Sequence, residues 1–254
     1  MTAFIRVMEH ESDIYPRPLR EKERDALDFV LPEGSPGYAE YRRRVARMVV
    51  LAEGRRGKGN LVLGEWGDRA DTSSPLAAVV AYGVVETTQD TYTITVRECI
   101  NDQIDVEIVS SHGGEIPDHY EEKRRWTYSS WRPGMLSPAT GMPVREVRVT
   151  SSHVLVMARD DRRIWLHDAG TGINHLIPIT NFYNELMLHK GIRDPKIALD
   201  ARLFFDDVEK YSDADLSEAF VAYNRVRKKV DLIMEETPAA PRGWKAFFGR
   251  LFRR

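Results

Sequence analysis

The sequence predicts an α+β fold in which helices from the two ends of the chain flank a largely antiparallel sheet. Residues 91–97 alternate between apolar and polar side chains, the two-residue period of a strand with one buried face. Other apolar runs of strand length fill the middle of the 254-residue chain, whereas apolar side chains at helical spacing occur near its two ends. This segregation is typical of an α+β domain.

The clearest strands form a meander. They are predicted over residues 76–85, 91–97 and 104–108. The connector 86–90 and the turn at Asn101 are short and polar, so only antiparallel pairing is possible. Three strands with one apolar face need a cover, and the neighbouring helices in the sequence are the candidates.

Two helices are predicted before the meander. Pro18 fits the first turn of a helix that ends at Leu31, because Pro32 follows. A second helix starts after Ser35 and ends near Gly54. Its apolar residues recur at steps of three and four, namely Tyr38, Tyr41, Val45, Met48 and Ala52. We expect an irregular or strand-like lead-in over residues 1–17 and a short strand over 61–64.

A second group of strands is predicted after the meander. These strands lie around Val147 and over residues 154–157, 164–166 and 175–179. Together the two groups make six to eight strands, in one large sheet or in two stacked sheets. Between the groups we expect a short helix over 118–126 and a loop over the proline- and glycine-rich stretch 132–143. That loop either covers a pocket as a lid or is a crossover packed by its own aromatic side chains.

Three helices are predicted after residue 180. The first spans 181–190, and the second is opened by Asp194 and Pro195. The third begins at Ser212, which forms a capping-box pattern with Asp215. Its apolar residues keep heptad spacing, namely Leu216, Ala219, Tyr223, Val226, Val230 and Ile233. This helix either lies against the sheet or associates with another copy as a coiled coil.

The end of the chain differs in kind from the rest. We expect a single α+β domain over residues 1–236, an extended proline- and alanine-rich linker over 237–243 and a tail over 244–254. As a helix, the tail gathers large apolar side chains on one face and basic side chains around the rest. The residues concerned are Trp244, Lys245, Phe247, Phe248, Arg250, Leu251, Phe252, Arg253 and Arg254.

The tail suggests the function. A helix of this length that contains Gly249 is marginal in water, so it needs a surface on which to fold. We expect a soluble binding or scaffold protein whose tail docks reversibly on an anionic membrane surface or on a partner protein. Alternatively, the tail folds back on its own chain or joins subunits by self-association.

Composition limits the other possibilities. A net charge of −2 argues against a protein dominated by contacts with nucleic acid. Cys99 is the only cysteine, which excludes an intrachain disulfide and a cysteine-cluster zinc site. The sequence has no signal-peptide core and no apolar run long enough to span a membrane. We therefore expect a cytoplasmic protein that can lie peripherally at the inner face of the membrane.

An enzyme or a small-ligand-binding domain is the first alternative function, and the sequence leaves enzymatic activity open. The candidate catalytic residues are His167, Asp168, His153 and His175, beside a pocket lined by residues 126–143. Histidine and carboxylate side chains together can perform acid–base catalysis or bind a metal. Because no metal signature and no Rossmann or nucleophile motif occurs, we expect no metal and no cofactor. The plainer interpretation is a hairpin turn stabilised by Asp168.

Binding of an anion or of nucleic acid is the second alternative function. Five basic residues lie near the glycine-rich turn 54–60, namely Arg43, Arg47, Arg55, Arg56 and Lys58. Their side chains and the backbone N–H groups of the turn could hold a phosphate. The turn is no Walker A loop, because Gly59 stands where a serine or threonine would bind magnesium. The plainer interpretation is a solvated helix face that ends in a glycine cap.

Overall fold

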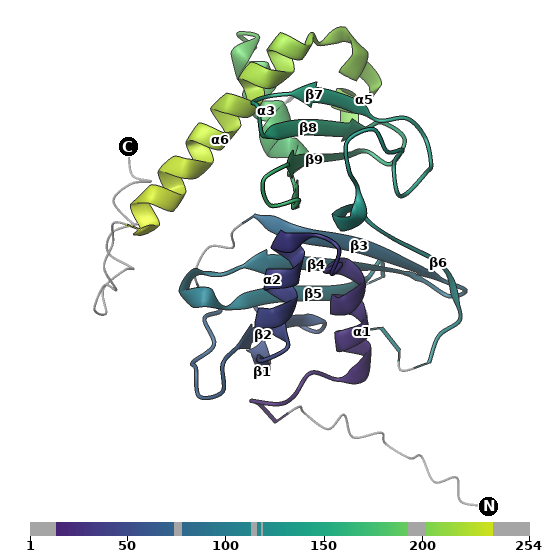
Figure 1. Cartoon of the computed structure of the whole chain (residues 1–254), viewed down its shortest axis with the longest axis vertical. Helices are drawn as coiled ribbons and strands as arrows, with labels where there is room; N and C mark the ends of the chain where they lie inside the picture. Colours follow the sequence, from purple (N-terminus) through teal and green to yellow (C-terminus); the bar gives the residue numbers. More distant parts are fainter. Residues whose placement is uncertain (1–13, 74–77, 113–115, 118, 193–201, 236–254) are drawn as a thin grey trace, which may run out of the picture. The chain divides into compact units, whose positions relative to one another are not determined.

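The structure, a computed structural model, describes residues 14–73, 78–112, 116–117, 119–192 and 202–235. Its elements are those of an α+β fold, with antiparallel strands and flanking helices (Figure 1). The chain divides into two compact units, Met1–Ile177 and Pro178–Arg254, and each is described by itself. The single domain over 1–236 stays a prediction, and the predicted linker 237–243 and tail 244–254 lie outside the described residues.

The first unit contains one antiparallel sheet of ten described strands. They are β1 (Val49–Glu53), β2 (Asn60–Gly64), β3 (Val79–Thr87), β4 (Thr91–Glu98), β5 (Ile104–Ser110), β6 (Glu122–Thr127), β7 (Arg145–Arg148), β8 (His153–Ala158), β9 (Arg163–Asp168) and β10 (Asn174–Leu176). Their order is β1-β2-β5-β4-β3-β10-β9-β8-β7, and β6 also pairs with β3. The prediction of six to eight strands was too low, because it missed β1 and β6.

The predicted meander is confirmed as β3, β4 and β5, with antiparallel pairing throughout. The apolar residues Tyr92, Ile94 and Val96 of β4 are buried, as the alternation required. The Thr87 hydroxyl closes the β3–β4 connection, since it accepts from the Asp90 N–H at 3.0 Å and donates to the Asp90 carbonyl at 2.9 Å. The polar connector is therefore a turn that fixes the register of the two strands.

Strand β3 is the point at which the sheet branches. One edge of β3 pairs with β4, and the other edge is divided between two strands. Val79 pairs with Leu176 of β10, whereas the part from Gly83 to Thr87 pairs with β6. The β3–β10 pair thus joins the meander to the second group of strands, which are paired through β10, β9, β8 and β7.

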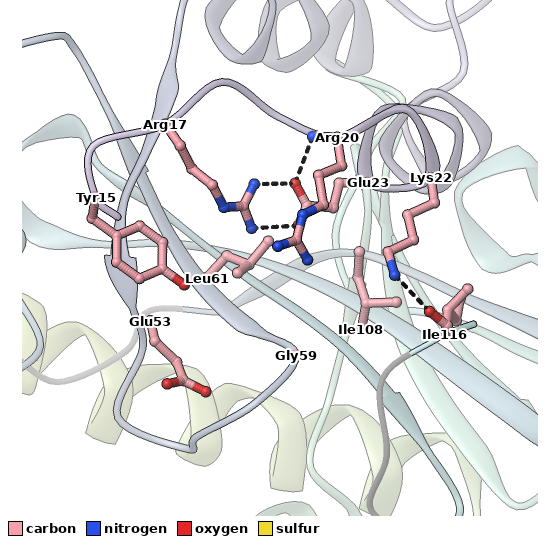
Figure 2. Close-up of a pocket in the computed structure, with 10 residues that line it drawn as sticks. All are labelled: Tyr15, Arg17, Arg20, Lys22, Glu23, Glu53, Gly59, Leu61, Ile108 and Ile116. Atoms are coloured by element: carbon pink, nitrogen blue, oxygen red, sulfur yellow. Dashed lines mark hydrogen bonds and ion pairs between the residues drawn. The ribbon is translucent and has the colours of Figure 1, made fainter. Parts of the chain in front are cut away.

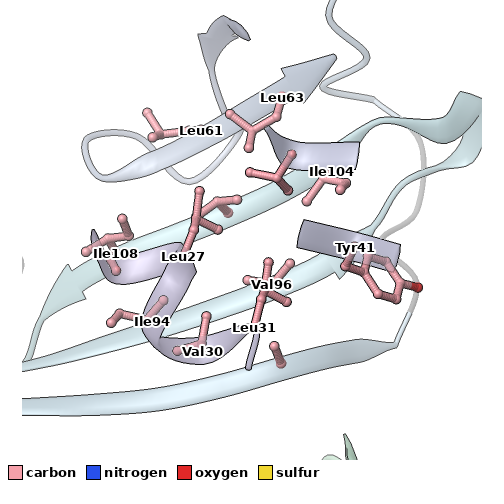
Figure 3. Close-up of a cluster of buried hydrophobic side chains, with 14 of the residues drawn as sticks. Leu27, Val30, Leu31, Tyr41, Leu61, Leu63, Ile94, Val96, Ile104 and Ile108 are labelled. Atoms are coloured by element: carbon pink, nitrogen blue, oxygen red, sulfur yellow. The ribbon is translucent and has the colours of Figure 1, made fainter. Parts of the chain in front are cut away.

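Two helices cover one face of the meander (Figure 1). They are α1 (Glu21–Val30) and α2 (Pro36–Val45). Apolar side chains of α1, α2 and the strands form one buried cluster (Figure 3). It includes Leu27, Val30 and Tyr38 from the helices and Ile94, Val96, Ile104 and Val106 from the strands. The expected cover for the meander is therefore present, at least on this face.

The second helix ends earlier than the sequence suggested. The predicted end near Gly54 is wrong, because α2 stops at Val45 and residues Val49–Glu53 form β1. Tight turns end the helix, with the Met48 N–H donating to the Val45 carbonyl at 3.1 Å. The apolar residues of a five-residue strand also fit helical spacing, so only the pairing with β2 distinguishes the two.

The short helix predicted over 118–126 is also wrong in its described part. Glu122–Thr127 is strand β6, paired with β3. The four residues from Glu122 to Arg125 are all exposed and charged, so they offer no apolar stripe to a helix. Charged side chains are common on strands at a sheet edge, where they discourage pairing with other chains. The loop over 132–143 and four strands after it are present, but the last of them, β10, ends at Leu176 and not at Ile179, because helix α3 begins at Ile179.

The described part of the second unit is helical. It contains α3 (Ile179–His189), α5 (Arg202–Asp207) and α6 (Asp213–Glu235), and α3 packs against α6. The capping box is confirmed, since the Asp215 N–H donates to Ser212 Oγ at 3.2 Å and the Ser212 N–H donates to Asp215 Oδ2 at 3.1 Å. The helix start predicted at Asp194 lies outside the described residues. None of the described helices has both the length and the apolar character needed to cross a bilayer.

Candidate functional site

The predicted catalytic aspartate stabilises a turn. Asp168 ends β9, and its Oδ1 accepts from the Gly170 N–H at 2.8 Å while its Oδ2 accepts from the Thr171 hydroxyl at 2.9 Å. The Gly172 N–H donates to the Asp168 carbonyl at 2.7 Å. Partial burial would raise the pKa of this carboxyl, but the bonds from Thr171 and Gly170 hold it below its ordinary value. Both carboxylate oxygens thus serve the hairpin, which is the plainer of the two interpretations.

The three histidines do not converge with Asp168 on one point. His153, His167 and His175 lie on the neighbouring strands β8, β9 and β10. His153 is paired with Asp168 across β8 and β9, so these two side chains share a face of the sheet. His167 is one residue away from Asp168 and therefore points to the opposite face. His175 is paired with Leu166 and therefore lies on the same face as Asp168, two positions along β9. Of the predicted catalytic residues, only His153 is directly paired with Asp168.

His167 belongs to a buried polar junction instead. Its Nδ1 lies 2.8 Å from Asn174 Oδ1, and the imidazole packs edge-on against the Trp131 ring at 5.7 Å. The Asn174 amide donates to the carbonyls of Tyr128 at 2.7 Å and Trp131 at 2.9 Å. Asn174 thus ties β10 to β9 and to the segment that follows β6. Sequence reasoning missed this residue, because its partners are distant in the chain and no local pattern marks it.

The aromatic residues before the loop 132–143 are packed against one another. The Tyr128 and Trp131 rings are buried and contact the Trp165 ring, with centroid separations of 5.2 Å and 5.4 Å. Trp126 packs at the edge of the same cluster. The loop is thus anchored on its own aromatic side chains, as in the crossover alternative. The ring contacts fill the space beneath it.

An acidic side chain lies at the border of this aromatic cluster. Asp161 Oδ2 accepts hydrogen bonds from the Tyr128 hydroxyl and, at 3.4 Å, from the Ser137 hydroxyl. Burial raises the pKa of the Asp161 carboxyl, even though Tyr128 and the nearby Arg163 favour its ionised form. Burial also raises the pKa of Tyr128. The Tyr128 hydroxyl and the Asp161 carboxyl are thus joined by a hydrogen bond in a mostly apolar setting.

The predicted anion-binding residues are divided between two elements. Arg43 and Arg47 lie on and just after α2, whereas Arg55, Arg56 and Lys58 lie in the β1–β2 hairpin, where Gly57 and Gly59 take positive φ angles of 84° and 81°. Arg43 forms an ion pair with Glu40, and Arg56 forms one with Glu107. The glycines therefore build a hairpin and not a helix cap, and two of the five basic residues are neutralised by carboxylates.

A small polar pocket lies where the chain enters α1 (Figure 2). Its volume of about 30 Å³ fits roughly one water molecule. Glu23 crosses it, accepting from both terminal nitrogens of Arg17 at 2.8 Å and 2.7 Å and from the Arg20 N–H at 2.8 Å. Lys22 Nζ donates to the Ile116 carbonyl at 2.8 Å. These contacts hold the start of α1 in place and leave little room for an organic ligand.

A serine, a histidine and an aspartate meet on the β4–β5 side of the sheet, but not as a catalytic relay. Asp90 Oδ1 accepts from the Ser111 hydroxyl and lies 3.0 Å from His112 Nδ1. Ser111 Oγ lies 3.2 Å from the same Nδ1. A relay requires the acid and the nucleophile to contact different ring nitrogens. The cluster therefore links the β3–β4 turn, which contains Asp90, to the end of β5.

Among the described residues, no group of three or more histidine, cysteine or acidic side chains is arranged to hold a metal ion. No protein-family model, curated protein or solved structure matches this chain.

Proposed function

We propose that this chain is a binding protein that attaches reversibly to an anionic membrane surface through its tail, residues 244–254. The observation that carries the proposal is the sequence of the tail. Five large apolar residues, Trp244, Phe247, Phe248, Leu251 and Phe252, fall at helical spacing, and basic residues occupy other positions. This combination is typical of helices that lie in the plane of a membrane surface.

The free energies of apolar burial and of charge attraction favour reversible binding of the tail to a membrane surface. Burial of the five apolar side chains contributes on the order of 5 to 10 kcal/mol before the cost of ordering the helix. Each basic residue adds about 1 kcal/mol near an anionic bilayer. Residues 242–254 contain five basic and no acidic residues, so the attraction depends on the lipid charge. The linker 237–243 gives the tail reach from the body.

The described part of the chain before the linker supports a binding role more than a catalytic one. Both oxygens of Asp168 accept bonds within a turn, and His167 Nδ1 is engaged by Asn174. The residues that were the best candidates for chemistry therefore have structural roles. A folded body that presents a membrane-binding tail agrees with this use of its polar groups.

Co-sedimentation with lipid vesicles tests the proposal. The full chain, a chain that ends at Glu236 and a variant with Phe247→Ser and Phe248→Ser are mixed with anionic or neutral vesicles at low and physiological salt. We expect only the full chain to pellet, and only with anionic vesicles. A matched control is Trp66→Ser, which removes another exposed aromatic side chain and should still pellet. If the full chain stays in solution with anionic vesicles, the tail binds a protein surface and the membrane proposal is overturned.

A further inference from the structure

A second surface of the first unit has the features of a protein-binding site. In the loop 132–143, hereafter the apolar loop, Met135, Leu136 and Met142 are 49%, 54% and 50% exposed. Pro133 and Pro143 are exposed as well. Methionine side chains are flexible and polarisable, and they recur on surfaces that bind other proteins. Several exposed apolar residues in one short segment mark an interaction site more often than a scattered few do.

The apolar loop is held in a fixed conformation. The Ser137 N–H donates to the Met142 carbonyl at 2.8 Å, which brings the middle of the loop beside its C-terminal end. Trp131 Nε1 donates to the Met135 carbonyl at 3.0 Å, and the Gly134 N–H donates to Glu146 Oε1 at 2.8 Å. Ser137 and Ala139 of the loop are buried, as is Trp131 just before it. Because the loop is already ordered, a partner would lose little free energy in ordering it.

The apolar loop leads into an edge strand. Within the described residues, β7 pairs only with β8. The Val149 N–H donates to the His153 carbonyl at 3.0 Å, and antiparallel strands alternate between bonded and non-bonded pairs. The register therefore directs the N–H and C=O groups of Glu146 and Arg148 away from β8. An extended peptide could add to this edge through those groups.

Charge selects the kind of partner. Residues 132–163, which include the apolar loop, β7 and the β8–β9 turn, contain six arginines and three acidic residues, although the whole chain carries −2. Arg132 is the first residue of the loop and donates to the Ser129 and Trp131 carbonyls, whereas Arg148 is exposed on β7. A second copy would bring the same arginines together across a twofold axis. The chain's own tail is basic and would be repelled. An acidic segment fits the surface best.

We propose that the apolar loop and β7 bind an extended, acidic segment of a partner protein with apolar side chains at alternate positions. The apolar side chains contact Met135, Leu136 and Met142, the carboxylates face the arginines, and the backbone pairs with β7. This site is separate from the tail. A chain with both could hold such a partner at a membrane surface.

A defined peptide tests the proposal. The probe is a fluorescent octapeptide of alternating leucine and glutamate, titrated with the full chain and followed by fluorescence anisotropy. Peptides that alternate leucine with lysine, or serine with glutamate, test the charge and the apolar side chains. A leucine–glutamate peptide methylated at alternate backbone nitrogens tests the pairing with β7. We expect binding of the first peptide alone.

Variants locate the site. Met135→Ser with Leu136→Ser should weaken binding about tenfold, as expected for the loss of central apolar contacts, and Arg148→Glu should weaken it further. Trp66→Ser and the chain that ends at Glu236 should bind as the unchanged protein does. Equal binding by the double-serine variant, or loss of binding on removal of the tail, would overturn the proposal. Equal binding of the leucine–lysine peptide would also overturn it.

Discussion

Asn174 offers the most direct test of what holds the first unit together. Its side chain is buried, and it connects strand β10 to His167 and to the carbonyls of Tyr128 and Trp131. The Asn174 N–H also donates to the Tyr38 hydroxyl at 2.8 Å, but that backbone bond survives a change of side chain. Asn174→Ala therefore removes the side-chain hydrogen bonds to His167 and to the carbonyls of Tyr128, Ser129 and Trp131, and leaves the contact with helix α2 in place.

The size of the effect follows from these contacts. A typical hydrogen bond contributes about 1 kcal/mol net, and a buried polar group left without its partner costs about 1–3 kcal/mol. His167 Nδ1 and three carbonyls would lose a partner at once. We expect Asn174→Ala to lower the free energy of unfolding by about 3–5 kcal/mol, a large share of the ~5–15 kcal/mol typical of a folded domain.

Urea unfolding followed by tryptophan fluorescence measures this loss. Trp131 and Trp165 report on the junction, because their rings contact each other and the Trp131 ring contacts His167. Asn181→Ala is the matched control, since Asn181 is exposed on α3, and it should change the free energy of unfolding by less than about 0.5 kcal/mol. If Asn174→Ala costs no more than this control, the junction does not stabilise the unit as argued.

Three further changes have defined outcomes. Asp161→Asn should raise the free energy of unfolding in urea more at pH 7 than at pH 4. The raised pKa of Asp161 means that its ionised form costs stability as pH rises, whereas asparagine carries no charge and still accepts from Tyr128. The same change in the free energy of unfolding at both pH values would contradict this. Gly172→Ala should lower the free energy of unfolding by about 1–2 kcal/mol in the same assay, since Gly172 has a φ of 73° and an added Cβ would lie 2.4 Å from Ser35 Oγ. Gly134 also has a positive φ, but nothing lies near its Cβ, so Gly134→Ala measures the backbone strain without the steric clash. Ser212→Ala should lower the stability of the second unit by about 1 kcal/mol, measured by circular dichroism, and Ser212→Asp should restore it.

Local sequence patterns predicted much of the fold. The alternation in residues 91–97 and the capping box at Ser212 each depend on a few neighbouring residues, and both are confirmed. Strand β1 was missed because Met48 and Ala52 continue a helical spacing, so a local pattern could not separate strand from helix. Strand β6 was missed because its run of exposed charged residues shows no alternation of apolar and polar side chains, and only pairing with β3 makes it a strand.

The candidate site was less predictable than the fold. Whether His153, His167 and His175 meet depends on the alternation of side chains across three strands, and a shift of one residue moves each to the other face. Asn174 contacts Tyr38, Tyr128 and Trp131, which lie far from it in sequence. No local signal could have marked it. By contrast, the proline and glycine content of 132–143 did mark the apolar loop, although not its exposed methionines.

The branching at β3 sets an order for assembly of the first unit during synthesis. Strands β3, β4 and β5 are consecutive, so they can pair as soon as they leave the ribosome. The other edge of β3 stays unpaired until β6 and then β10 are synthesised, and β10 is the last strand of the sheet to be made. Until Leu176 pairs with Val79, one edge of this part of the valine-rich strand β3 has no neighbouring strand. That interval is when the nascent chain is most open to pairing with the wrong strand, its own or another molecule's.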